Sequence, residues 1–254
     1  MVRPPSVVTS VPVADLRADP REDTELVDQS VFGDRLAVLG ERGDWLWVQG
    51  DDHYFGWIAR GETSALRSAS NEVLVAVLLA EVRIEPEPDS PPIVLLPAGA
   101  VLTAWRREGA WTELALGWVR LADLVLPSDL PERAPTADDL IATARAFLGT
   151  PYLWGGTSGR GIDCSGLVQQ VYRLNGVGLD RDADQQALEG RPVEAPRAGD
   201  LLFFGSPAVT HVALSLGGDG FIHAPMRGGA VEERTIGPDR IPVSVRRYLP
   251  EVLA

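Results

Sequence analysis

The chain has 254 residues and a formal net charge of −13, which argues against nucleic acid or an anionic membrane as its main partner. It contains one cysteine and no lysine, which excludes an internal disulfide, a lysine Schiff base and a phosphate-loop lysine. No apolar run approaches the roughly 18 residues that a membrane span needs. The length allows one large domain or two to three small ones, and the acidic balance favours a ligand that carries an amine.

Residues 7 to about 66 are predicted to form short strands and turns. Apolar or alternating residues occupy 35–39 and 45–48, a charged turn lies at 41–44 between them, and Gly56-Trp57-Ile58 completes the set.

A weaker copy of this order follows in the chain. It consists of a strand at 101–105, a turn at 106–109, a strand at 111–114 and then Gly117-Trp118-Val119. The repeat predicts two small β-barrels, residues 1–67 and 68–127. Their arrangement resembles that of bacterial SH3-like domains.

The first copy has an additional loop at residues 50–55, which carries aromatic side chains and two carboxylates. A solvated hairpin tip is the more common explanation of such a loop, and a binding role is the alternative.

A proline-rich linker is predicted at residues 128–135, and the rest of the chain, 136–254, forms a separate domain. A helix begins at Thr136, with Asp139 placed for a capping box. A second helix follows, then a short buried strand at 201–204, and then strands at 211–216 and 220–224. Helices followed by strands predict an α+β fold.

The cysteine lies between a glycine-rich loop and the second helix. Five glycines fall between residues 154 and 166, and Asp163 is a suitable N-cap. Cys164 therefore lies in the first turn, where the helix dipole and a basic partner can lower a thiol pKa from about 8.5 to roughly 3.5–7.5. We interpret Cys164 as a nucleophile. The alternative is a small buried side chain, as most lone cysteines are.

Two of the three histidines follow the cysteine in the same domain. His211 and His223 lie on strands joined by a glycine-rich turn, so antiparallel pairing would bring them together. Residues 211–216 alternate, so we expect the side chain of His211 to share a face with Ala213 and Ser215 while the valine and leucines point into the core. His211 is predicted to be the base and His223 the residue that orients it. A core histidine in either position and a zinc site with Cys164 are the alternatives, and the set has no obvious fourth zinc ligand.

The chain from residue 150 resembles the NlpC-type cell-wall cysteine peptidases, which have a permuted papain-like fold. The resemblance rests on five ordered blocks: Thr150-Pro151-Tyr152-Leu153-Trp154-Gly155-Gly156, Asp163-Cys164-Ser165-Gly166, Gly199-Asp200-Leu201-Leu202-Phe203-Phe204, Thr210-His211-Val212-Ala213 and Phe221-Ile222-His223-Ala224. With two SH3-like barrels ahead of this domain, the chain is similar to the subset that cleaves γ-D-glutamyl-L-diamino acid bonds.

This resemblance implies a set of substrate-binding residues. The implied set comprises Tyr152, Trp154, Asp163, Ser165, Arg181 and Asp182 in the last domain, and Glu25 and Tyr54 in the first. The family often has Ser or Thr after the Asp182 position, where this chain has Ala183.

The resemblance also implies a reaction and a setting for it. We expect hydrolysis of small wall peptides that begin with a free L-Ala, as part of cytoplasmic recycling, because residues 1–10 do not resemble a secretory signal. We expect a monomer that needs no cofactor or metal and binds neither nucleic acid nor membrane. An endopeptidase acting on intact wall and a non-catalytic wall-peptide binding protein are the alternatives.

Overall fold

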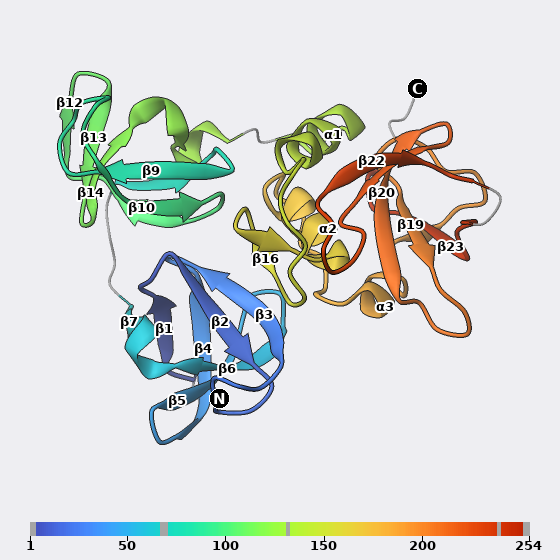
Figure 1. The fold of residues 1–254 in the computed structure, drawn as a ribbon, viewed down its shortest axis with the longest axis horizontal. Helices are drawn as coiled ribbons and strands as arrows, with labels where there is room; N and C mark the ends of the chain where they lie inside the picture. The colour runs from blue at the N-terminus through green and yellow to red at the C-terminus, as the bar shows by residue number, and fades with distance from the viewer. Residues whose placement is uncertain (1–3, 67–70, 131–132, 238–239, 251–254) are drawn as a thin grey trace. The chain divides into compact units, whose positions relative to one another are not determined.

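The computed structural model describes residues 4–66, 71–130, 133–237 and 240–250 (Figure 1). The chain divides into two compact units, one up to residue 131 and one from residue 132, and the division falls within the predicted linker at 128–135. The predicted boundary at 67/68 lies outside the described residues. Within the described ranges, no helix is long and apolar enough to cross a membrane.

The first part of the N-terminal unit is an antiparallel sheet in the order β3-β2-β6-β5-β4-β1-β7. Its strands are β1 (Ser6–Thr9), β2 (Val13–Arg17), β3 (Leu26–Val31), β4 (Arg35–Arg42), β5 (Trp45–Gln49), β6 (Phe55–Ala59) and β7 (Thr63–Ala65).

The predicted strands of the first copy correspond to β4, β5 and β6. Arg42 pairs with Trp45, so the β4–β5 hairpin turns through two residues, the first of which is Gly43 with a φ of +58°. A left-handed residue is what a tight hairpin of this kind requires. Alternate residues point inward and form one core, which consists of Ala14, Leu16, Leu36, Leu46, Val48 and Ile58.

The second part of this unit contains a five-stranded sheet in the order β10-β9-β14-β13-β12 and a three-stranded sheet in the order β11-β8-β15. Its strands are β8 (Glu72–Val75), β9 (Leu79–Arg83), β10 (Pro92–Pro97), β11 (Val101–Thr103), β12 (Arg106–Glu108), β13 (Trp111–Leu114), β14 (Gly117–Arg120) and β15 (Leu124–Val125). The predicted turn at 106–109 is wrong in part, because residues 106–108 form β12 and pair with β13.

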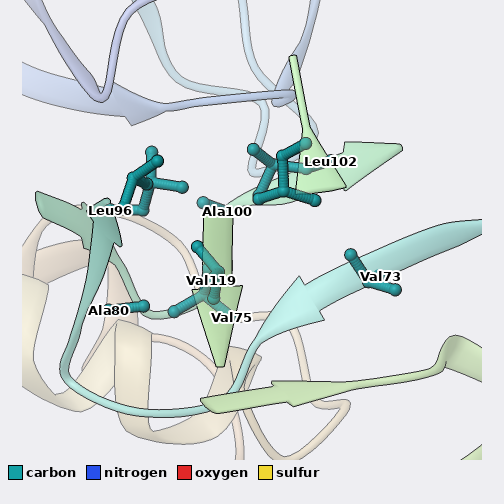
Figure 2. Close-up of a cluster of buried hydrophobic side chains, with 9 residues drawn as sticks. Val73, Val75, Ala80, Leu96, Ala100, Leu102 and Val119 are labelled. Carbon is teal, nitrogen blue, oxygen red and sulfur yellow. The ribbon is translucent and has the colours of Figure 1, made fainter. Parts of the chain in front are cut away.

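A separate core fills this second part, as Figure 2 shows. Small and branched side chains from several strands meet there, among them Val73, Val75, Leu96, Leu102 and Val119. The repeat is also visible in the backbone, because β6 is followed by a 3₁₀ helix, η1 (Arg60–Glu62), and β14 by η2 (Leu121–Asp123). The assignment of this part as a second SH3-like barrel stays a prediction.

The C-terminal unit packs helices against one antiparallel sheet (Figure 1). A short 3₁₀ helix, η3 (Pro127–Asp129), precedes it. Its helices are α1 (Ala137–Ala146), α2 (Cys164–Arg173) and α3 (Ala183–Gln186). The sheet order is β18-β23-β19-β20-β21-β22, made of β18 (Arg191–Pro192), β19 (Leu201–Phe204), β20 (His211–Gly217), β21 (Gly220–His223), β22 (Glu232–Thr235) and β23 (Ser244–Arg247). A two-stranded ribbon, β16 (Thr157–Ser158) and β17 (Gly161–Ile162), precedes α2.

The caps of the two long helices are as predicted. The Thr136 hydroxyl accepts the amide of Asp139, and the Asp139 carboxylate accepts the amide of Thr136, which completes the capping box of α1. Asp163 caps α2 by accepting the amide of Gly166 at 2.7 Å.

Strand β20 is buried on both faces, which differs from the sequence analysis. We expected only the valine and leucines of 211–216 to point into a core, yet Ala213 and Ser215 are also fully buried. Helix α2 packs against β20, and Ala213 belongs to a further cluster with Leu202, Phe204, Phe221 and Val245. A central strand covered by a helix on one face and side chains on the other loses its polar alternation.

The close contact between Gly166 and the backbone of Gly156 is a testable feature of this fold. A Cβ at residue 166 would lie 2.3 Å from the carbonyl oxygen of Gly156, a backbone atom that cannot rotate away. We expect Gly166→Ala to lower the free energy of unfolding by about 1–3 kcal/mol or more, as overpacking does. Gly178→Ala is the matched control, because a Cβ there meets nothing within 4 Å. Urea denaturation of both variants measures the difference. Equal stabilities of the two variants would contradict the close approach of residue 166 to the carbonyl oxygen of Gly156.

Candidate active site

Helix α2 and strand β20 place the cysteine. Cys164 is the first residue of α2 and is 9% exposed. Backbone hydrogen bonds from Val212 and Ser165 reach its thiol. Because Val212 directly follows His211, the bond from β20 holds the sulfur beside the strand end that carries this histidine.

The electrostatics of the thiol differ from our expectation. Burial raises the pKa of the Cys164 thiol to about 11, and the neighbouring Asp163 carboxylate adds to the increase, while the two backbone bonds and Arg181 oppose it. The expectation of a lowered pKa was therefore wrong, because desolvation and the Asp163 carboxylate outweigh the two backbone bonds and Arg181. The raised pKa favours the protonated thiol near neutral pH.

The two predicted histidines meet across the β20–β21 hairpin. His211 Nε2 and His223 Nδ1 are 2.8 Å apart, and the rings lie edge to face with centroids at 5.0 Å. The pKa of both imidazoles is lowered to about 4, mainly by burial and in addition by neighbouring positive charge, while Asp163 opposes the shift of His211. Both rings are neutral near pH 7, so His211 can accept a proton.

The Asp163 carboxylate connects the parts of the site. Its Oδ1 accepts from Gly166 N, the Ser165 hydroxyl and Arg181, and its Oδ2 accepts from Gly155 N and Arg181. One carboxylate thus ties together the glycine-rich loop, the first turn of α2 and a buried cation.

Arg181 is 1% exposed and also donates to the Ser165 hydroxyl at 2.9 Å. Its guanidinium is buried against the Asp163 carboxylate and is not exposed to solvent. This geometry favours a role in holding Asp163 in place over the direct substrate contact that the resemblance implied. A direct contact of Asp163 or Ser165 with substrate stays a prediction, since their polar atoms already take part in this network.

Tyr152 lies within electrostatic range of the thiol. Burial raises the pKa of its hydroxyl to about 12, and Cys164 and Asp163 contribute. The hydroxyl is therefore protonated near neutral pH and can donate a hydrogen bond.

The loop after β21 lies against Tyr152, since Tyr152 N donates to Gly229 O at 2.8 Å. Arg227 on this loop is exposed and lowers the pKa of Tyr152. Sequence reasoning missed this cation, because only tertiary structure brings residues 152 and 227 together.

The other predicted substrate residues are placed as follows. Trp154 is 57% exposed beside the glycine-rich loop. Asp182 immediately precedes α3 and is half-buried, with its amide bonded to Gln185.

Glu25 and Tyr54 belong to the other unit. Glu25 is exposed before β3, and Tyr54 is half-buried in a loop closed by a bond from Gly50 N to Tyr54 O. Their part in the site stays a prediction.

Among the residues that the structure describes, no group of three His, Cys, Asp or Glu side chains is arranged to hold a metal ion. Cysteine hydrolases use a thiol at a helix start beside a pair of side chains that act as base and orienting group, and the arrangement of Cys164, His211 and His223 is of this kind.

Comparison with known proteins identifies the kind of hydrolase. Residues 149–240 match the model of the NlpC/P60 family, and residues 16–62 match the model of the bacterial dipeptidyl-peptidase Sh3 domain. The chain is 32% identical to a gamma-D-glutamyl-L-lysine dipeptidyl-peptidase of Bacillus subtilis (strain 168), over 84% of this chain and 77% of that protein. The chain belongs to the NlpC/P60 family of cysteine peptidases, with an SH3-like domain ahead of the peptidase domain.

Two further relatives extend over most of the chain. Dipeptidyl-peptidase 6 of Lysinibacillus sphaericus is 32% identical over 88% of this chain and 89% of its own length. The crystal structure of an NlpC/P60 family protein from Bacillus cereus ATCC 10987 has a TM-score of 0.83 at 25% identity, and covers 96% of this chain and 100% of its own.

The buried Asp163–Arg181 pair generates a stability prediction. Arg181→Met leaves the Asp163 carboxylate buried without its cation, so we expect a loss of about 3–5 kcal/mol in the free energy of unfolding. Adding Asp163→Asn removes that charge, and the double variant should lose less than the sum of the two single variants. Urea denaturation of the four proteins checks this, and additive losses would show that the pair is not coupled.

The shifted pKa values generate a pH prediction. His211 must be neutral to accept a proton, and with a pKa of about 4 it stays neutral as the pH falls from 7 to 5. We expect kcat/KM to hold over that range and to fall as the pH passes below about 4.

Alkylation of Cys164 by iodoacetamide tests the raised pKa of the thiol. The rate should rise about tenfold per pH unit through the neutral range, because thiolate is the reactive form. A rate that reaches its plateau below pH 8 would contradict the raised pKa.

Proposed function

We propose that the protein hydrolyses the γ-D-glutamyl-L-diamino acid bond of cell-wall peptides that begin with a free L-Ala. The observation that carries the proposal is the hydrogen-bonded His211–His223 pair beside Cys164. It occurs in a chain whose similarity to gamma-D-glutamyl-L-lysine dipeptidyl-peptidases extends through the N-terminal unit. That name describes release of a two-residue unit, which suits a substrate recognised by its amino terminus.

The proposed chemistry is acyl transfer to water through a thioester. The Cys164 sulfur attacks the γ-glutamyl carbonyl carbon while its proton passes to His211. The Cys164 backbone N–H and the Tyr152 hydroxyl stabilise the oxyanion. His211 then gives the proton to the departing amine as the C–N bond breaks.

The second half regenerates the enzyme. His211 takes a proton from a water molecule, the water oxygen attacks the thioester carbonyl, and the sulfur leaves and recovers the proton. The neutral state of His211 at rest supports this role, since it must act as a base twice in each cycle.

In this proposal, negatively charged side chains attract the protonated amino group of the substrate. Asp163 supplies the negative charge, and Ser165, Asp182 and Trp154 complete the pocket, while binding roles for Glu25 and Tyr54 stay predictions from the resemblance. Because both Asp163 oxygens already accept hydrogen bonds, its contribution is mainly the field of its charge. The setting that we propose is cytoplasmic recycling of murein peptides by a monomer.

Paired substrates test the proposal. We expect the protein to cleave L-Ala-γ-D-Glu-L-diamino acid tripeptide, to lose kcat/KM by at least about 100-fold on the N-acetylated peptide, and to be inactive as Cys164→Ala. Product analysis by mass spectrometry identifies the bond that is cut. Equal cleavage of both peptides would contradict amine recognition, and an active Cys164→Ala protein would contradict the mechanism.

Intact wall provides the second arm of this experiment. Release of peptides from sedimented peptidoglycan, together with binding to it, would favour an endopeptidase acting on the wall. We expect neither.

A further inference from the structure

One nitrogen of the catalytic pair lacks a partner. His223 is 1% exposed, and its Nδ1 is engaged with His211. Its Nε2 is buried and has no hydrogen-bond partner among the described residues. Buried polar atoms nearly always have partners, so the group that faces this nitrogen is of interest.

That group is the carboxylate of Glu232. Strands β21 and β22 are antiparallel, and His223 lies directly opposite Glu232 in their register. Glu232 Oε1 is 3.6 Å from His223 Nε2, slightly beyond a hydrogen bond. The same oxygen accepts from Arg234 Nε at 2.8 Å, so the carboxylate lies between a neutral imidazole and a guanidinium.

The surroundings of the histidine pair define its charge balance. His211 extends from β20, Glu232 and Arg234 from β22, and Arg240 from the segment after β22. Arg234 and Arg240 lower the pKa of His223, whereas Asp163 beside α2 raises that of His211. In the immediate contacts of His223, Glu232 is the anion that can offset the cations when a proton arrives.

We propose that Glu232 is a positioning residue that accepts a hydrogen bond from His223 Nε2 and thereby selects the tautomers of both imidazoles. The inference rests on the proposed function, in which His211 takes the proton of Cys164.

The tautomer argument follows the protons along the chain of groups. If Glu232 accepts a hydrogen bond from His223 Nε2–H, then His223 Nδ1 is unprotonated and must accept a hydrogen bond from His211 Nε2–H. His211 Nδ1 is then also unprotonated, and its lone pair can take the thiol proton. If His223 instead carried its proton on Nδ1, it would donate to His211 Nε2, and neutral His211 would carry its own proton on Nδ1. His211 would then have no free nitrogen to act as a base.

No proton needs to reach Glu232 in this arrangement. After the thiol proton arrives, His211 is an imidazolium that still donates from Nε2 to His223, and His223 still donates from Nε2 to Glu232. The carboxylate stabilises the new charge through the intervening ring, as the acidic member of a triad does.

Adjacent residues of β22 offer matched variants. Glu233 is an exposed carboxylate one position further along the strand, paired with Arg145 at 2.7 Å. Glu232→Ala and Glu233→Ala therefore remove the same charge and nearly the same side-chain bulk from neighbouring positions. Arg234→Gln removes the competitor for Glu232 Oε1 and so acts in the opposite direction.

Steady-state kinetics on the tripeptide over pH 3–9 is the first test. We expect Glu232→Ala to lower kcat by about 10- to 100-fold with KM changed by less than about twofold, and Glu233→Ala to match the parent protein. The acid limb of kcat/KM should move to lower pH in Glu232→Ala and to higher pH in Arg234→Gln. A purely structural role would not produce shifts of opposite sign.

Nitrogen NMR of histidine-labelled protein is the second test, and it does not depend on activity. The parent should show His211 and His223 each protonated on Nε2, with His53 in the other unit as a reference, and Glu232→Ala should show mixed tautomers. If Glu232→Ala does not fold, Glu232→Gln, which keeps an acceptor oxygen and loses the charge, takes its place and should show the shifted acid limb.

The outcomes separate the two proposals. Identical kinetics and tautomers in Glu232→Ala and Glu233→Ala, with Cys164→Ala inactive, would overturn the role of Glu232 and leave the peptidase mechanism in place. Activity in Cys164→Ala would overturn the mechanism itself.

Discussion

The buried carboxylate of Asp163 is the interaction on which the site depends. It caps α2, bonds the glycine-rich loop through Gly155 N and pairs with a guanidinium that is almost wholly buried. A buried charge is costly unless it is paired and fully hydrogen-bonded, and this one accepts from five donors. The first turn of α2, and with it Cys164, is therefore held in one geometry.

The electrostatic consequence is a site that rests in neutral form. The carboxylate that organises the site also disfavours a thiolate next to it, and burial disfavours charge on the thiol and on both imidazoles. In the proposed reaction, charge appears only as the sulfur attacks, and the Cys164 backbone N–H and the Tyr152 hydroxyl stabilise the oxyanion that forms.

Local signals in the sequence were sufficient for several elements. The Thr136–Asp139 box and the Asp163 cap marked both helix starts, and the spacing of His211 and His223 around a glycine turn predicted their antiparallel contact. These features depend on residues close in the chain, where turn and cap chemistry dominate. The strand β12 was missed, because a charged edge strand resembles a turn.

The sequence by itself determined the helix that begins at Cys164, the histidine hairpin and the family resemblance, because each depends on short-range pattern and ordered motifs. Only the tertiary structure showed that Arg181 lies behind Asp163, that the thiol pKa is raised and that Glu232 faces His223. Burial and cross-strand neighbours set these properties, and both arise from packing between segments far apart in the chain. Composition and spacing carry no measure of desolvation, which is the largest cause of the shifts in Cys164, His211 and His223.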